Sequence, residues 1–208
     1  MAADIQQTPF IKQLAASANP LPQQRLSKSL ASLLLALPTH VFIPFLSAFF
    51  QTIINYWSSI PALRLDKYLF LIRLYVLDSF VYLSRKGWDK DLVDAWRGML
   101  VGEQAKGSNG ECAGVMDPMD QKIGDGLRYH LLDVWVDGLV NSVDWAVGVE
   151  RGIMGPIEGL AKEGQGRTVR ERASDVLSDE RLLGDAKVDG VDLMAVQEDD
   201  GEFGGFED

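Results

Sequence analysis

The hydrophobic positions of this chain recur at helical spacing over almost its whole length. Leu65, Leu69, Ile72 and Val76 lie three or four residues apart, as on the buried side of an amphipathic helix. No segment sustains the strict alternation of a half-buried strand. The pattern therefore predicts helices over about 7–16, 22–37, 44–57, 61–85, 90–101, 119–147 and 167–183, with a short weak one near 157–162.

Proline and aspartate residues mark several of the expected helix ends. Pro38 should end the second predicted helix, while Pro44 and Pro61 should begin the third and fourth, because proline is tolerated in a first helical turn but interrupts a helix interior. Asp89 is a suitable N-cap for the fifth helix. Short links between successive helices favour antiparallel hairpins.

We predict an all-α fold in which these hairpins stack as an irregular α-solenoid of the HEAT or armadillo type. The chain shows no clear internal repeat, so this expectation rests on the layout of the helices. We expect a helical domain over 1–163 with a Gly-rich loop at 102–117, a charged segment with a helical pattern over 164–183, and a disordered acidic tail over 184–208.

Basic and acidic residues are distributed unevenly between the two halves of the chain. Residues 1–100 carry 10 Lys and Arg against 6 Asp and Glu, whereas residues 101–208 carry 10 against 24. No basic residue follows Lys187, while eight carboxylates do. This asymmetry is typical of a folded, weakly basic part followed by an acidic tail.

A membrane protein is the alternative that the hydropathy pattern leaves open. No charged residue occurs between Ser29 and Leu63, and a span within residues 30–57 would be long enough to cross a bilayer. Pro38 and Pro44 interrupt this run, and polar residues occupy its second half. The pattern therefore favours two buried helices over a membrane span.

Motifs for catalysis, metals and cofactors are missing from the sequence. His40, His130 and Cys112 cannot supply a His/Cys zinc site of standard spacing. The glycines at 102–114 do not follow a strand, as a phosphate-binding loop would require. We predict no enzymatic activity, no cofactor, no metal site and no small-molecule substrate.

Two groups of charged residues are the candidates for contacts or for structural polar positions. The first lies at the start of the predicted helix 61–85 and has two interpretations: a solvated helix surface, or contact with phosphate or an acidic partner. The second lies on the predicted helix 119–147 and has the spacing of a structured polar face. The first group comprises Arg64, Asp66, Lys67 and Arg73, and the second Arg128, His130, Asp133 and Asp137.

Both groups fall within blocks that resemble a known protein family. Residues 49–73 read FFQTIINYWSSIPALRLDKYLFLIR, and residues 124–139 read GDGLRYHLLDVWVDGL. These blocks resemble the ribosomal RNA processing protein 1 family, although Gly138 replaces the family's usual glutamate. Residues 8–17 and 19–34 resemble two further blocks that lie much farther apart in the family. An internal deletion near Ser17–Asn19 is therefore expected.

This resemblance implies a non-enzymatic ribosome biogenesis factor of the nucleus and nucleolus. Such a protein would act in rRNA processing as a helical scaffold within preribosomal particles. Its expected partners are other ribosome assembly factors and these particles, with pre-rRNA as a further partner. The candidate partner or RNA contacts are Arg64, Lys67, Arg73 and Arg128, and the candidate structural polar residues are Asp66, His130, Asp133 and Asp137.

Overall fold

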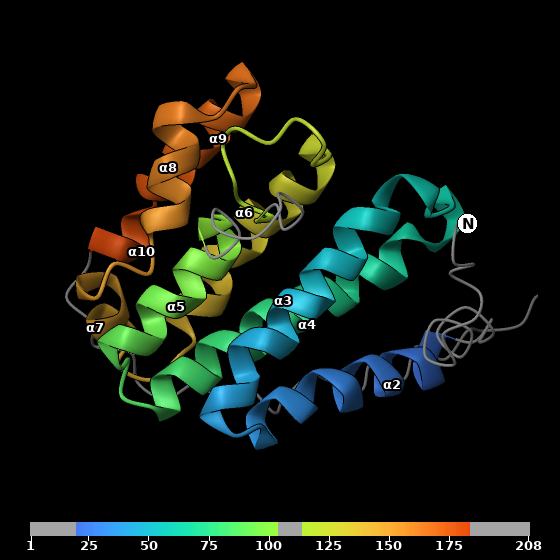
Figure 1. The fold of residues 1–208 in the computed structure, drawn as a ribbon, viewed down its shortest axis with the longest axis horizontal. Helices are drawn as coiled ribbons and strands as arrows, with labels where there is room; N and C mark the ends of the chain where they lie inside the picture. The colour runs from blue at the N-terminus through green and yellow to red at the C-terminus, as the bar shows by residue number, and fades with distance from the viewer. Residues whose placement is uncertain (1–19, 104–113, 184–208) are drawn as a thin grey trace, which may run out of the picture.

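The computed structural model describes residues 20–103 and 114–183, which form helices and no strand (Figure 1). This confirms the predicted all-α class for the described part of the chain. The α-helices are α2 (Pro20–Ser32), α3 (Thr39–Tyr56), α4 (Ala62–Arg85), α5 (Lys90–Leu100), α6 (Asp125–Val140), α7 (Trp145–Glu150), α8 (Gly155–Glu163), α9 (Arg167–Leu177) and α10 (Glu180–Leu183). Two short 3₁₀ helices, η2 (Leu33–Ala36) and η3 (Trp57–Ser59), connect the first three.

Helices α3 and α4 form a long antiparallel hairpin, and α2 runs along α4 (Figure 1). Aromatic stacking joins the two arms of the hairpin. The ring centres of Phe42 and Tyr82 lie 3.9 Å apart, and those of Phe49 and Tyr75 lie 3.8 Å apart. Such stacked pairs add to the free energy gained by burying the rings themselves. The hairpin is therefore held together along most of its length.

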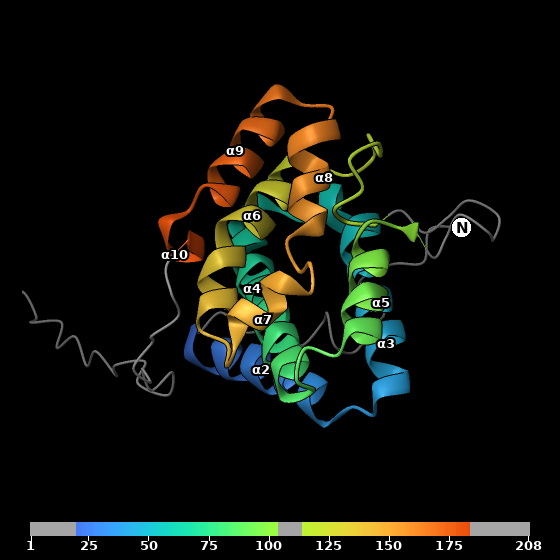
Figure 2. The same ribbon diagram turned by 90° about the vertical axis from the view of Figure 1, so that its left-hand side faces the viewer.

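Helix α6 packs on α4 and also contacts α9 and α10 (Figure 2). Three aromatic side chains meet at the centre of the molecule, one from each of α4, α5 and α6. The ring centre of Phe80 lies 5.6 Å from that of Trp96 and 5.5 Å from that of Trp135, and the two indoles are 5.4 Å apart. All three are at most 2% exposed, so α6 completes the core.

Helix α3 begins earlier than the sequence pattern predicted. Pro38 is its N-cap, and Pro44 lies inside the helix instead of beginning it. A proline at this position removes the N–H that would donate to the carbonyl of His40. Burial of Phe42 and Ile43 in the extra turn offsets that loss. The prediction of a start near Pro44 was therefore wrong.

The predicted helix over 119–147 is two shorter helices. Before α6, the carboxylates of Asp117 and Asp120 accept hydrogen bonds from the backbone N–H groups of Met119 (2.9 Å) and Lys122 (2.7 Å). Such local bonds favour turns over helix. Between α6 and α7, Asp144 adopts a left-handed backbone conformation with φ of 51°, which interrupts the helix.

Smaller differences occur at α2 and α9. The predicted helix 22–37 begins at Pro20 and tightens into η2 at Leu33. The predicted helix 167–183 is divided into α9 and α10, because the carboxylate of Asp179 accepts a hydrogen bond from the backbone N–H of Arg181. Stacking of the hairpins as a solenoid is not confirmed. The predicted helix 7–16, the Ser17–Asn19 junction and the acidic tail 184–208 lie outside the described residues.

Candidate protein and RNA interface

The turn from α3 into α4 presents apolar and basic side chains side by side. We call residues 57–67 the α3–α4 corner. Leu63 is 96% exposed, Arg64 beside it is exposed, and Lys67 is half-buried one turn later. Pro61 precedes α4, and no side chain caps the helix there. The N-terminus of a helix carries partial positive charge, which adds to the charge of the two basic residues.

The corner is held in place by contact with the start of α6. A Cβ atom added at Gly124 would lie 2.8 Å from two atoms of the Trp57 indole. No side chain can be accommodated at that distance, so glycine allows the indole to approach the backbone closely. Trp57 is half-buried as a result. The last residue of the aromatic block 49–57 is therefore fixed against the second family-like block.

Arg73 does not belong to the same surface as Arg64. Nine residues correspond to about two and a half turns of helix, so the two side chains leave α4 on opposite sides. One guanidinium nitrogen of Arg73 lies 3.9 Å from a carboxylate oxygen of Asp137 on α6. The predicted contacts are therefore separated: Arg64 and Lys67 lie at the corner, while Arg73 lies beside α6.

Arg128 is buried, which corrects its assignment as a partner contact. Its residue is 4% exposed, and its guanidinium donates to the backbone carbonyls of Asp117 (2.6 Å), Asp120 (2.7 Å) and Ile123 (3.4 Å). These bonds secure the turns that lead into α6. A guanidinium that is surrounded in this way cannot reach a partner, so its role is structural.

His130 supports the packing of α6 on α4. Its Nε2 atom lies 2.8 Å from the carbonyl oxygen of Leu69, so this nitrogen carries the proton and donates it. Burial lowers the pKa of His130 below its ordinary value of 6.5, and the charge of Arg73 acts in the same direction. The hydrogen bond to Leu69 and the charge of Asp133 oppose the shift.

The carboxylates predicted as structural polar positions differ in their surroundings. Asp66 is exposed at the corner. Asp133 lies 3.5 Å from a guanidinium nitrogen of Arg172 on α9, and Asp137 lies 2.8 Å from one of Arg181 on α10. The side chains of these last two arginines are about half exposed, at 46% and 50%. Sequence spacing does not connect Arg172 or Arg181 to these carboxylates, since the partners lie 39 and 44 residues apart.

The two family-like blocks are in direct contact in the structure. The Trp57–Gly124 approach, the His130–Leu69 hydrogen bond and the Arg73–Asp137 ion pair all join one block to the other. Beyond the first block, Gly138 allows α6 to approach α4 closely, because a Cβ atom there would lie 3.0 Å from the Phe80 ring. The paired blocks therefore form one structural unit, on which Arg64 at the corner and Arg73 beside α6 are exposed and Lys67 is half-buried.

Leu63 is the residue at the corner that the sequence analysis missed. A signal for it was present: Leu63 lies on the opposite side of α4 from the predicted buried positions. Of these positions, Ile72 is buried, while Leu65 and Leu69 are half-buried. At 96%, Leu63 is more exposed than Leu33, Met119 or Val143, the other exposed large apolar residues of the described chain.

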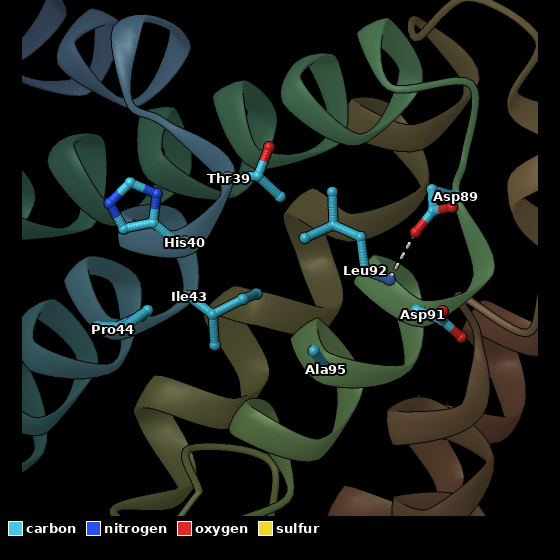
Figure 3. A pocket seen from close by; sticks show the side chains of 8 residues that line it. All are labelled: Thr39, His40, Ile43, Pro44, Asp89, Asp91, Leu92 and Ala95. Atoms are coloured by element: carbon cyan, nitrogen blue, oxygen red, sulfur yellow. Dashed lines mark hydrogen bonds between the residues drawn. The ribbon is translucent and has the colours of Figure 1, made fainter.

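A shallow groove of about 440 Å³ lies between the first turns of α3 and α5 (Figure 3). Ile43 and Leu92 point toward each other across it, and the Asp89 carboxylate is occupied as the N-cap of α5, accepting a hydrogen bond from the Leu92 N–H (3.0 Å). The full lining is Thr39, His40, Ile43, Pro44, Asp89, Asp91, Leu92 and Ala95. These groups form an apolar floor with a polar rim and no nucleophile beside a base.

The described residues contain neither a cluster of metal ligands nor a helix that could span a membrane. Over 20–103 and 114–183, no three His, Cys, Asp or Glu side chains gather in a way that could hold a metal ion. Within the same ranges, every helix is too short or too polar to cross a membrane. Within residues 30–57, where a membrane span was the alternative expectation, η2 and Pro38 divide the run into two helices.

Comparison with known sequences places the chain in a family. The family described as "Nucleolar protein, Nop52" matches residues 14–202. The chain is 34% identical over 124 residues to human ribosomal RNA processing protein 1 homolog B, covering 58% of this chain and 14% of that protein. It is 30% identical over 121 residues to mouse homolog A, covering 58% and 22%. The chain thus spans less than a quarter of the length of these two relatives.

The family match covers both family-like blocks and all of the described residues. It confirms the resemblance to ribosomal RNA processing protein 1 that the blocks at 49–73 and 124–139 indicated. The family description names a nucleolar protein and no catalytic activity. The chain therefore belongs to the Nop52, or ribosomal RNA processing protein 1, family of nucleolar proteins.

Proposed function

We propose that this protein is a non-enzymatic ribosome biogenesis factor that acts in rRNA processing in the nucleolus. It binds other assembly factors within preribosomal particles as a helical scaffold, with pre-rRNA as a further partner. Family membership and the names of the relatives support the process. The observation that carries the binding mode is the α3–α4 corner, where an exposed leucine lies beside two basic residues at an uncapped helix end.

The composition of the corner favours an acidic protein surface as the first partner. Phosphate contacts alone would need only Arg64, Lys67 and the helix N-terminus. Leu63, at 96% exposed, would gain nothing from a phosphate but would bury apolar area against a protein. The same basic residues can reach an RNA phosphate at the edge of such a contact.

The distribution of charge agrees with this orientation. Residues 20–86, which form α2 to α4, carry seven Lys and Arg against two Asp, a net charge of +5. The described residues from 87 to 183 carry ten against seventeen, a net charge of −7. A particle rich in RNA is negatively charged, so it attracts the basic part formed by α2 to α4 and repels the acidic part that follows. The α3–α4 hairpin would therefore face the particle.

Charge reversal at the corner tests the proposal. The double variant Arg64→Glu/Lys67→Glu should reduce co-sedimentation of the full chain with preribosomal particles by about ten-fold, as expected for loss of two contacting charges. Glutamate in the first turns of a helix interacts favourably with its dipole. The variant should therefore keep its helicity, so that lost association cannot be attributed to unfolding of α4.

The matched control changes the net charge by the same amount in the acidic part. Lys122→Glu/Arg151→Glu replaces two exposed basic residues outside α2 to α4 and should leave co-sedimentation unchanged. Equal losses in both double variants would mean that only net charge matters, and would remove the corner as the contact. A wild-type chain that does not co-sediment at all would refute the scaffold function itself.

A further inference from the structure

The last two helices of the described chain lie on the outside of α6 (Figure 2). We call α9 and α10, residues 167–183, the strap. Helix α9 contacts α8 and α6, and α10 contacts α6. Tyr129, Asp133 and Asp137 of α6 lie one helical turn apart along the side that the strap contacts. The strap therefore covers a polar stripe of α6, while Val169 and Ala173 on its inner side join the hydrophobic core.

Few apolar side chains attach the strap to the rest of the molecule. Only Val169 and Ala173 of the eleven residues in α9 are buried, whereas α6 buries nine of its sixteen. Val176, Leu177 and Leu182 add half-buried contacts. Since hydrophobic stabilisation scales with buried apolar area, α9 and α10 are held less firmly than α6.

Arg172 makes the first of two polar attachments. One of its guanidinium nitrogens lies 3.5 Å from Asp133 Oδ1, and its guanidinium carbon lies 4.5 Å from the ring centre of Tyr129. A cation above an aromatic ring and beside a carboxylate is attracted by both. Arg172 thus bridges two successive positions of the stripe.

Arg181 makes the second attachment, at the junction of α9 and α10. Its Nη1 donates to Asp137 Oδ1 at 2.8 Å, while Nε and Nη2 donate to the carboxylate of Asp179 at 2.9 and 2.7 Å. Asp137 is also approached by Arg73 from α4, at 3.9 Å. Arg181 therefore attaches the end of the strap to Asp137, a carboxylate that also lies near Arg73.

The link between α8 and α9 contains the sequence Gly164-Gln165-Gly166. A Cβ atom at Gly164 would collide with the carbonyl oxygen of Leu160, so the tight turn requires glycine there. Arg170 fastens the turn by donating to the Gly164 carbonyl (2.6 Å). This short link would remain as the attachment point if the helices beyond it separated from α6.

We propose that the strap opens from α6 as one unit while the rest of the described fold stays intact, and that Arg172 and Arg181 hold it closed. Opening frees Tyr129, Asp133 and Asp137 from their contacts with Arg172 and Arg181. Ion pairs between half-exposed groups weaken as salt screens them, so the closed state is sensitive to ionic strength. Segments with little buried apolar area open locally before the whole protein unfolds.

Hydrogen exchange of the full chain, followed by mass spectrometry, tests this proposal. The variant Arg172→Ala/Arg181→Ala should exchange about ten-fold faster over 167–183, with α4 and α6 unchanged, as local opening requires. The variant Arg167→Ala is the matched control: its side chain is 85% exposed and pairs with Glu171 inside α9. It should exchange like the wild type.

Two further measurements keep the outcome decisive. Asp133→Asn/Asp137→Asn removes the same ion pairs without changing the helical propensity of α9, and it should also accelerate exchange over 167–183. Raising salt from about 0.05 to about 0.5 M should accelerate the wild type more than either double variant. The proposal would be overturned if, in every variant, the hydrogen-exchange rates over 167–183 changed in parallel with those of α6. So would an Arg167→Ala effect equal to that of Arg172→Ala/Arg181→Ala.

Discussion

Helix α6 has two contrasting contact surfaces. Toward α4 it presents Trp135 and Gly138, which meet the Phe80 ring in a buried seam. Toward α9 and α10 it presents Asp133 and Asp137, whose side chains are 63% and 43% exposed. The first surface is specified by shape and the second by charge. One helix can therefore belong to the permanent core and still offer a surface that responds to its surroundings.

The largest effect on stability is expected from a substitution in the buried seam between α4 and α6. Phe80→Ala should lower the free energy of unfolding by about 3–5 kcal/mol, because it empties the space between the indoles of Trp96 and Trp135. Urea denaturation followed by circular dichroism measures this. Leu63→Ala is the control: at 96% exposed, it should change stability by less than about 0.5 kcal/mol. A small effect of Phe80→Ala would mean that the seam does not hold α4 to α6.

Overfilling the same seam should have the next largest effect. At Gly138, a Cβ atom would lie 3.0 and 3.2 Å from two carbons of the Phe80 ring, so Gly138→Val should destabilise the protein by about 1–3 kcal/mol. Gly159 in α8 has no neighbour within 4 Å of such a Cβ. Gly159→Val should therefore be neutral in the same denaturation experiment. Equal effects at both positions would show that helix propensity, not contact with Phe80, governs the result.

The charged surface of α6 should contribute less. Arg172→Ala/Arg181→Ala is expected to cost about 0.5–1.5 kcal/mol at low salt, since each half-exposed ion pair is worth about 0.2–1 kcal/mol. Unfolding at low and high salt measures this cost, which should shrink as the salt concentration rises. A cost as large as that of Phe80→Ala, and independent of salt, would make the two surfaces of α6 equivalent.

The smallest effect concerns the pH dependence of the seam. The pKa of His130 is lower in the folded protein than its ordinary value of 6.5, chiefly because of burial. The unfolded chain therefore binds this proton more readily, so His130 should contribute a loss of stability to the wild type as the pH falls below 6.5. His130→Gln can still donate to the Leu69 carbonyl and should lose less stability, by under about 1 kcal/mol. If the wild type and His130→Gln lost the same stability as the pH fell, His130 would not be the cause of the pH dependence.

The sequence pattern located most of the helices, and it failed where local bonds compete with helix. Helices α4 and α5 begin and end close to the predicted positions, since Pro61 and Asp89 mark their starts directly. The turns before α6 depend on side-chain bonds from Asp117 and Asp120, which hydrophobic periodicity does not register. The start of α3 depends on how much burial compensates for Pro44, and only the packed structure shows that.

The spacing of the candidate contacts in the sequence did not sort them by accessibility. Arg64 and Arg128 have the same chemistry in the sequence, yet Arg64 is exposed and Arg128 is 4% exposed. The difference arises because three backbone carbonyls of the preceding turns converge on Arg128. No spacing rule reveals such convergence. Every residue carries a backbone carbonyl, so the sequence does not indicate which carbonyls will meet one guanidinium.

Hydrophobic periodicity, composition and two short blocks of residues were enough to predict the helical class, the charge asymmetry and the family of this protein. Those features depend on neighbouring residues or on composition, so they can be read along the chain. The contact between the two blocks, and the reach of Arg172 and Arg181 to α6, became apparent from the folded structure. Contacts between residues far apart in the sequence depend on how the helices pack. A single amino-acid sequence does not specify that packing directly.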